Sequence, residues 1–214
     1  MSNEKIRSYY DALAGRIESA DATRNKAPDS TEFDVAYMKE FADPSASLLE
    51  LGAGTGLLLN RIMDDFGQIV AVELYPAFSK FITPAAHVQI VNADLLGFET
   101  DAVFDIVILF GVMNYFNAEE AAGLYRKIAR WVKPGGKLVV KNQMGRTEDV
   151  VVDGLSQELQ SSYYSEYRTP AHEMRLIEST GLKVLRQDDI YPEHFNRWPN
   201  TRFVALLAER PADR

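Results

Sequence analysis

Short apolar runs rich in β-branched residues recur along the chain and alternate with segments of helical periodicity. The runs that we predict to be strands are 47–51, 68–74, 87–91, 104–110, 137–141, 182–190 and 202–208. Helical patterns separate most of them, at 55–66, 76–83, 118–132 and 170–180. Alternation of this kind is typical of parallel strands joined by crossover helices. We therefore expect an α/β fold with helices on both faces of the sheet.

The two ends of the chain add to this pattern. Residues 3–19 and 30–42 have the periodicity of helices, with Asp29 or Ser30 as the N-cap of the second. The last two predicted strands are joined by about 11 residues without helical pattern. That length is short for a parallel crossover and predicts an antiparallel pair at one sheet edge. The stretch 142–169 is long for a connection, so we expect it to be functional or partly helical.

Composition limits the class of protein. With 46% hydrophobic and 25% charged residues among 214, the chain is typical of one soluble globular domain. No apolar run approaches the roughly 20 residues of a membrane span, and the first ten residues do not resemble a signal peptide. We therefore expect a cytoplasmic protein without a membrane partner. The net charge of −8 opposes nucleic-acid binding, and zero cysteines exclude a thiolate nucleophile.

A glycine-rich turn follows the first predicted strand, in the sequence ELGAGTG (50–56). A dinucleotide-binding turn has the spacing G-x-G-x-x-G, but the position of the last glycine is Leu57 here. Glu50 also precedes the glycines, and no Lys or Arg lies in the turn to balance a pyrophosphate. A carboxylate suits a ligand with an ammonium and a sulfonium group. The turn therefore favours S-adenosylmethionine over a dinucleotide.

Two further carboxylates follow the next two strands. Glu73 closes the second strand, where a carboxylate can accept hydrogen bonds from both ribose hydroxyls of an adenosine. Asp94 follows the third strand and is placed to meet the adenine amine, with Leu95 covering the ring. We therefore expect three acids at one edge of the sheet.

Five segments in order resemble the class I S-adenosylmethionine-dependent methyltransferases: LLELGAGTG, VAVEL, NADLL, FDIVILFGVMNYF and VKPGGKLVV, which together span roughly 45–143. The resemblance implies a Rossmann-like seven-stranded sheet in the order 3-2-1-4-5-7-6, with strand 7 antiparallel. Three other segments, LFGVMNYF, KNQMG and NRWPNTRF, are similar to a bacterial subgroup associated with sugar and surface-polysaccharide modification.

The resemblance also implies a division of the chain and a set of cofactor contacts. Within one methyltransferase domain, the parts are an N-terminal helical cap (1–44), a cofactor-binding core (45–143), an insertion or lid (144–169) and a C-terminal helix with a β-hairpin (170–214). The residues expected to bind S-adenosylmethionine are Glu50, Gly52, Ala53, Gly54, Thr55, Gly56, Glu73, Leu74, Ala93, Asp94, Leu95 and Phe110.

The absence of particular residues and motifs excludes several classes of methyl acceptor. The chain lacks the cysteine needed to methylate C5 of a base, and GVMNY stands where exocyclic-amine DNA methyltransferases have N-P-P-Y or D-P-P-Y. The residues from Phe110 to Phe116 contain no acid, so we expect no magnesium or other metal. Transfer to a nitrogen or oxygen of a small molecule remains.

Three residues are candidates for the catalytic step. Several small-molecule members of the family have a histidine after strand four, but this sequence has Asn114. Its presence favours an amine over an alcohol, which benefits from a general base. We expect Asn114 and Tyr115 to orient the acceptor. Tyr10, beside Tyr9, resembles the N-terminal aromatic residue that closes over the sulfonium in related enzymes, with helix packing as the alternative.

Basic and aromatic residues gather in the loops at the same sheet edge. The expected acceptor-binding residues are Lys141, Arg146, Tyr164, Arg168, His194 and Arg197. On an acidic chain, such a rim predicts an acceptor with a phosphate or carboxylate, such as an amino sugar, a nucleotide sugar or a phosphorylated amine. The alternative is that the basic residues, Arg202 among them, form ion pairs with nearby acids, namely Glu166, Asp188, Asp189 and Glu193.

Two other functions stay open. An NAD(P)-binding oxidoreductase is opposed by the glycine spacing and by the lack of a Tyr-x-x-x-Lys pair. A catalytically silent cofactor-binding protein would have the same sequence features. The oligomeric state is not predicted.

Overall fold

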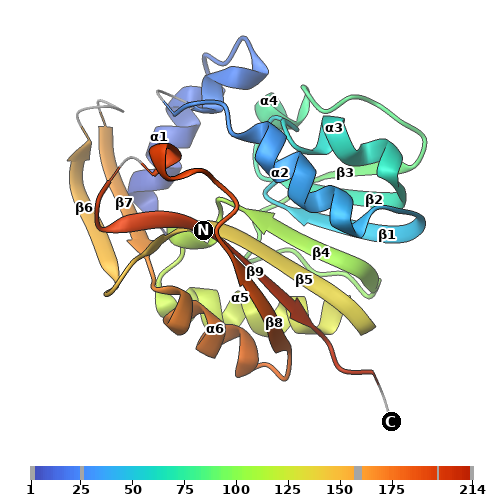
Figure 1. Ribbon diagram of the computed structural model, residues 1–214. Helices are drawn as coiled ribbons and strands as arrows, with labels where there is room; N and C mark the ends of the chain where they lie inside the picture. The colour runs from blue at the N-terminus through green and yellow to red at the C-terminus, as the bar shows by residue number, and fades with distance from the viewer. Residues whose placement is uncertain (1–2, 25–26, 157–160, 197, 213–214) are drawn as a thin grey trace.

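A computed structural model describes the chain except for residues 1–2, 25–26, 157–160, 197 and 213–214 (Figure 1). Its main sheet contains seven strands in the order β3-β2-β1-β4-β5-β9-β8. β9 is antiparallel to both neighbours, and the other pairings are parallel. The predicted order and the antiparallel edge pair are confirmed. The strands are β1 (Asp43–Leu51), β2 (Phe66–Glu73), β3 (Val88–Asn92), β4 (Phe104–Phe110), β5 (Val132–Gly145), β8 (Lys183–Asp188) and β9 (Thr201–Glu209).

Helices cover both faces of this sheet because successive strand residues point to opposite sides. Leu48 packs on one side with α2 (Thr31–Met38) and α3 (Leu59–Ile62). Leu49 packs on the other side with α5 (Ala118–Trp131) and α6 (Pro170–Glu178). Both leucines are fully buried. The central strands therefore need apolar residues at every position, which is the continuous pattern that the sequence has.

A second, two-stranded sheet lies apart from the main sheet, beside the N-terminal helix (Figure 1). It is the antiparallel hairpin of β6 (Val150–Ser156) and β7 (Ser161–Tyr167). α1 (Glu4–Ala14) packs against β7. The expectation that 142–169 is partly helical is wrong for the described residues, since 142–145 extend β5 and the rest contributes this hairpin.

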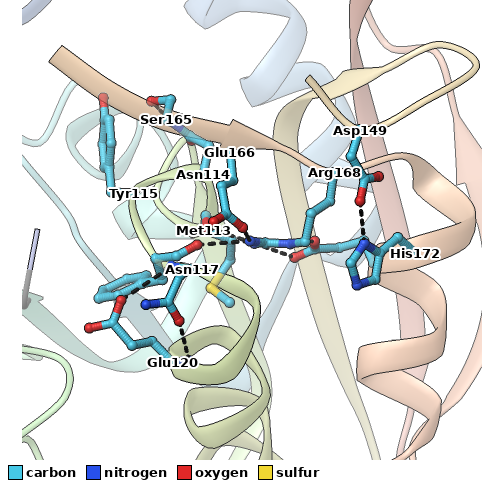
Figure 2. A network of polar contacts seen from close by, with 12 residues as sticks. Met113, Asn114, Tyr115, Asn117, Glu120, Asp149, Ser165, Glu166, Arg168 and His172 are labelled. Carbon is cyan, nitrogen blue, oxygen red and sulfur yellow. Dashed lines mark hydrogen bonds and ion pairs between the residues drawn. The ribbon is translucent and has the colours of Figure 1, made fainter. Parts of the chain in front are cut away.

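Several helices are shorter than the periodicity predicts. The pattern at 3–19 gives a helix that ends at Ala14, and the pattern at 55–66 gives only α3 and a 3-10 turn at Met63–Asp65. α4 (Pro76–Ser79) is likewise one turn long. α5 keeps its length because Asn117 and Glu120 form a reciprocal capping box at its start (Figure 2). No helix in the described part of the chain combines the length and the apolar character that a membrane crossing needs.

Candidate active site

The glycine turn lies at the carboxyl end of β1, next to the point where the strand order reverses between β1 and β4. Gly52, Gly54 and Gly56 have φ angles of 80°, 56° and 75°, a region that side chains other than glycine rarely adopt. A Cβ on Gly52 would lie 2.5 Å from the Val112 side chain. A Cβ on Gly54 would meet nothing within 4 Å. Gly54 therefore leaves open space above the turn.

Glu73 holds the glycine turn against the loop that follows β2. One carboxylate oxygen accepts a hydrogen bond from the amide of Gly54 at 2.9 Å, and the other accepts one from the amide of Tyr75 at 2.9 Å. Burial raises the pKa of Glu73, and these two backbone amides oppose the rise. The carboxylate thus has a structural task in addition to any ligand contact.

A first cavity, of about 200 Å³, lies over this turn. Seven of the predicted cofactor residues line it: Gly52, Gly54, Glu73, Leu74, Asp94, Leu95 and Phe110. Sequence reasoning missed several others, among them Thr23, Tyr75, Phe78, Gly111, Val112 and Phe116. Gly111 directly follows β4 and Tyr75 lies two residues after β2, so their positions at the carboxyl ends of parallel strands could have identified them.

Five predicted cofactor residues do not line the first cavity: Glu50, Ala53, Thr55, Gly56 and Ala93. Thr55 donates instead to the carbonyl of Ala20 at 2.8 Å, which anchors the N-terminal segment. Glu50 is 4% exposed, and among the described residues one of its oxygens has no hydrogen-bond partner. Burial, with Glu73 and Asp34 nearby, raises the pKa of Glu50 to about 8.

Asp94 is the predicted residue at the end of β3, and α1 contacts it. Its carboxylate accepts a hydrogen bond from the Arg7 guanidinium at 2.6 Å and another from the amide of Leu96 at 3.0 Å. Tyr75 donates to Asp11, also on α1, at 2.9 Å. The N-terminal helix is therefore tied to two loops that border the first cavity.

A second cavity, of about 510 Å³, adjoins the first. It lies among α1, the β6–β7 hairpin and the loop before β9, which emerges at the same sheet edge as the glycine turn, as the topology predicts. Tyr10, Thr23 and Tyr115 line both cavities. The hydroxyl oxygens of Tyr10 and Tyr115 lie 2.8 Å apart, and their rings pack edge to face. Burial raises the pKa of both phenols, so both are neutral near pH 7.

The tyrosines of β7 continue the wall of the second cavity. Tyr163 and Tyr167 line it, with their hydroxyl oxygens 3.2 Å apart. Ser165, which lies between them on the same strand face, donates to the Tyr163 hydroxyl at 2.8 Å. Asn114 donates to Ser165 at 3.2 Å but lines neither cavity (Figure 2). The structure therefore corrects the prediction for Asn114, because Ser165 and Tyr163 of β7 connect its side chain to the wall of the second cavity.

The predicted contact from Tyr164 also needs correction. Side chains alternate along a strand, so Tyr164 and Glu166 share the face opposite Tyr163. Tyr164 donates to Glu166 and does not line the second cavity. The segment SSYYSEY carries the alternation that would have identified Tyr163 and Tyr167, had it been interpreted as a strand.

Arg168 is not at the cavity either. It is 3% exposed, and its guanidinium donates to Glu173 at 2.5 Å and to the carbonyls of Met113 at 2.7 Å and Phe116 at 2.8 Å (Figure 2). These carbonyls belong to the loop after β4, which carries Tyr115. Arg168 therefore fixes that loop.

The other predicted basic residues are also committed to neighbours. Lys141 is buried and donates to Asp34 at 3.1 Å and to Tyr191 at 2.7 Å. Burial alone would lower the pKa of Lys141, but Asp34 and Tyr191 raise it above its usual value. Arg146 pairs with Glu193, and Arg202 pairs with Asp189.

His194 stacks on Phe195 and does not line the second cavity, whereas Arg197 lies outside the described residues. For Arg146, Arg168 and Arg202, the contacts are thus those of the ion-pair alternative.

Comparisons with known proteins connect this geometry to a family. Residues 49–140, from β1 into β5, match the family model described as a methyltransferase domain. This part of the chain is therefore similar to methyltransferase domains, and the whole chain has the fold of the class I S-adenosylmethionine-dependent methyltransferases.

One curated relative of the chain is phosphoethanolamine N-methyltransferase 1 of Triticum aestivum, 27% identical over 103 residues. The match covers 44% of this chain and 21% of the wheat protein, so the chain spans only about a fifth of that relative.

Two solved structures share the fold. The DhpI–SAM–HEP complex has a TM-score of 0.74 at 18% identity and covers 96% of each chain. The glycopeptide N-methyltransferase MtfA with S-adenosyl-L-methionine has a TM-score of 0.65 at 19% identity, covering 87% of this chain and 96% of its own. Both of these structures are complexes with S-adenosylmethionine.

The first cavity of this chain fits S-adenosylmethionine. Gly54 leaves space over the turn, and Glu73 and Asp94 present carboxylates to a cavity that is otherwise largely apolar. The described residues include no cluster of three or more His, Cys, Asp or Glu side chains that could hold a metal ion.

Proposed function

We propose that this methyltransferase holds S-adenosylmethionine in the first cavity and transfers its methyl group to a nitrogen or oxygen of a small molecule in the second. One observation carries the proposal: Tyr10 and Tyr115 line both cavities at once. An acceptor beside this pair lies next to the region where the sulfonium methyl group would be. The two reactants then meet without either leaving its cavity.

Different residues of the first cavity bind different parts of the cofactor. Glu73 accepts hydrogen bonds from the ribose hydroxyls while it keeps the Gly54 and Tyr75 amides in place. Asp94 and Leu95 hold the adenine, and Gly52 to Gly56 pass beneath the methionyl group. Glu50 lies buried behind the turn with one oxygen that has no hydrogen-bond partner among the described residues, and a bound ammonium or sulfonium group would favour loss of its proton.

Positioning of the two reactants and exclusion of water account for the rate of methyl transfer. S-adenosylmethionine supplies an activated methyl group, which transfers to a nucleophile held in line with its C–S bond. Tyr10 and Tyr115 fix the acceptor through their hydroxyls, and Phe78, Phe110 and Phe116 keep water away. Restricting two reactants to this geometry lowers the activation barrier without a strong base.

The finer proposal, an acceptor with an anionic group, has narrower support. Arg24 lines the second cavity, and the name of the wheat relative is compatible with a phosphorylated amine. Arg24 also forms ion pairs with Asp29 at 2.6 Å and with Asp21 at 3.1 Å, and these carboxylates offset much of its positive charge. An anion on the acceptor would therefore compete with these carboxylates.

Calorimetry and a transfer assay test the proposal. We expect S-adenosylmethionine and S-adenosylhomocysteine to bind and NADH not to bind, and we expect labelled methyl groups to reach a small-molecule acceptor. The variant Gly54→Val places a side chain in the cofactor space and forces a φ of 56° on a β-branched residue, so it should lose binding. Binding of NADH in place of S-adenosylmethionine would reject the proposal. Cofactor binding without transfer to any acceptor would identify a silent relative.

A further inference from the structure

We propose that the second cavity is a tyrosine-walled cation site and that the acceptor is an amine with an apolar body, methylated on nitrogen. This inference rests on the proposed function and names its substrate class. It follows from five tyrosines that line one part of the cavity, and from an aromatic surface elsewhere on its wall.

The tyrosine end is built as a box. Tyr10 meets Tyr9 at 5.1 Å between ring centroids with an interplanar angle of 69°, and it meets Tyr115 at 5.8 Å and 77°. Adjacent rings that are nearly perpendicular form the walls of a corner. Tyr163 and Tyr167 of β7 line the same cavity. Electron-rich ring faces and neutral hydroxyl oxygens attract a cation, most strongly where water is excluded.

The hydroxyl groups are held by a continuous set of hydrogen bonds. Asn114 donates to Ser165, Ser165 donates to Tyr163, and the Tyr163 oxygen lies 3.2 Å from that of Tyr167. Because Asn114 and Ser165 lie behind the wall, they fix the tyrosines without occupying the cavity. The box is therefore preorganised by the protein.

The charged groups around both cavities are already engaged. Glu73 accepts two backbone amides, Asp94 pairs with Arg7, and Asp153 of β6 pairs with Lys5. Arg24 pairs with acids of its own segment. Among the described lining residues there is no histidine. An alcohol would lack a positioned base here, whereas an amine that has lost its proton to solvent needs none.

The movement of charge during methyl transfer is compatible with a wall of tyrosine rings. The nitrogen lone pair forms the new N–C bond, the C–S bond breaks, and its electron pair stays on sulfur. Positive charge thus passes from the sulfonium to the nitrogen, and the resulting ammonium can release a proton to solvent. A surface that stabilises a cation at the junction of the cavities stabilises the charge where it arrives.

Away from the tyrosine box, aromatic rings and apolar side chains form part of the cavity wall. Tyr191 packs on Phe195 and Phe203 with centroid distances of 5.9 Å and 5.0 Å. Trp198 and Leu155 line the cavity while 43% and 75% exposed, so apolar side chains border its mouth. An acceptor with a hydrocarbon or aromatic body fits this surface, with its amine in the tyrosine box.

A matched pair of probes tests the box directly, in protein saturated with S-adenosylhomocysteine. Choline carries a quaternary ammonium group, and 3,3-dimethylbutan-1-ol has the same shape without the charge. We expect the wild type to bind choline at least about tenfold more tightly than its neutral isostere, which corresponds to about 1.4 kcal/mol. Tyr163→Leu should lose most of this preference, and Tyr163→Phe should keep most of it.

The neighbouring residue provides the control. Tyr164→Leu changes the same strand on the opposite face and should keep the wild-type preference, provided that thermal melting shows each variant folded. Equal affinity of the wild type for both probes, or no binding of either, overturns the cation site while S-adenosylhomocysteine still binds. Failure of S-adenosylhomocysteine itself to bind would instead reject the proposed function.

Discussion

The hydroxyl oxygens of Tyr10 and Tyr115 lie 2.8 Å apart although the residues are 105 positions apart in the chain. Tyr10 comes from α1, and Tyr115 comes from the 3-10 turn after β4. Their contact closes the N-terminal helix onto the sheet where the two cavities meet. A resemblance at the sequence level can suggest either residue, but only the fold brings them together.

Tyr10→Phe and Tyr115→Phe each remove one hydroxyl from this pair and keep the ring. Because a net hydrogen bond contributes about 0.5–1.5 kcal/mol, we expect kcat to fall about 2- to 12-fold. The affinity for S-adenosylhomocysteine should change little, since the phenyl rings still fill the wall. Steady-state kinetics and calorimetry measure the two effects. Tyr164→Phe is the matched control, and equal kcat in all four proteins would remove the pair from the catalytic step.

Glu73→Ala should weaken S-adenosylmethionine binding by about 1–3 kcal/mol, because the ribose hydroxyls lose a charged acceptor. The Gly54 and Tyr75 amides lose the same acceptor, so part of the effect comes from the loops. Glu73→Gln keeps one carbonyl oxygen and should fall between the wild type and Glu73→Ala. Calorimetric titration of the three proteins measures the order. Wild-type affinity in Glu73→Ala would place the cofactor elsewhere.

Glu50 gives the folded protein a distinctive pH dependence. Its pKa rises from 4.5 to about 8 on burial, so the folded state holds a proton that the unfolded chain releases. The free energy of unfolding should therefore fall as pH rises from about 5 to 8, by at most about 1.4 kcal/mol per pH unit. Urea melts of the unliganded protein at several pH values measure the slope. Glu50→Gln should lack this component, and parallel curves for the two proteins would contradict the assignment.

The sequence predicted the main sheet well because burial on both faces leaves a continuous apolar pattern in each strand. It also identified Glu73 and Asp94, since carboxyl ends of parallel strands meet at one edge. The acceptor side was harder to predict. Tyr163 and Tyr164 are adjacent and chemically identical, and only their strand register decides which one lines the cavity.

The ion-pair partners of the basic residues were also difficult to predict from the sequence. The chain has more acidic than basic residues, so most basic side chains find a carboxylate once the chain folds. The sequence positions of Arg146 and Arg168 indicate the correct edge of the sheet. Their partners, Glu193 and Glu173, depend on contacts that composition does not specify.

Turnover should be unchanged in EDTA, because the proposed transfer needs no Lewis acid. Aromatic rings are poor ligands for a hard cation, and the carboxylates that line the cavities are already held by backbone amides or basic side chains. The measurement compares initial rates before and after chelation and dialysis. Activity that disappears and returns only with magnesium would identify a metal site and contradict this prediction.

Arg168→Ala should destabilise the protein without changing which acceptor it prefers. The substitution leaves Glu173, itself buried, without its cationic partner, and breaking a buried pair in this way costs about 3–5 kcal/mol. Arg146→Ala breaks an exposed pair and should cost at most about 1 kcal/mol. Urea melts of the two variants measure this difference.

The same variants separate a structural arginine from an anion site. Arg168 donates to the carbonyls of Met113 and Phe116, so its loss displaces the loop of Tyr115 and should lower kcat for every acceptor alike. Rates with a phosphorylated acceptor and its dephosphorylated analogue should therefore fall by the same factor. Replacing both members of the pair, Arg168→Met with Glu173→Met, should recover part of the lost stability because no unpaired charge remains buried. A loss confined to the phosphorylated acceptor would instead assign Arg168 to substrate binding, since a loop displacement has no means of distinguishing the two acceptors.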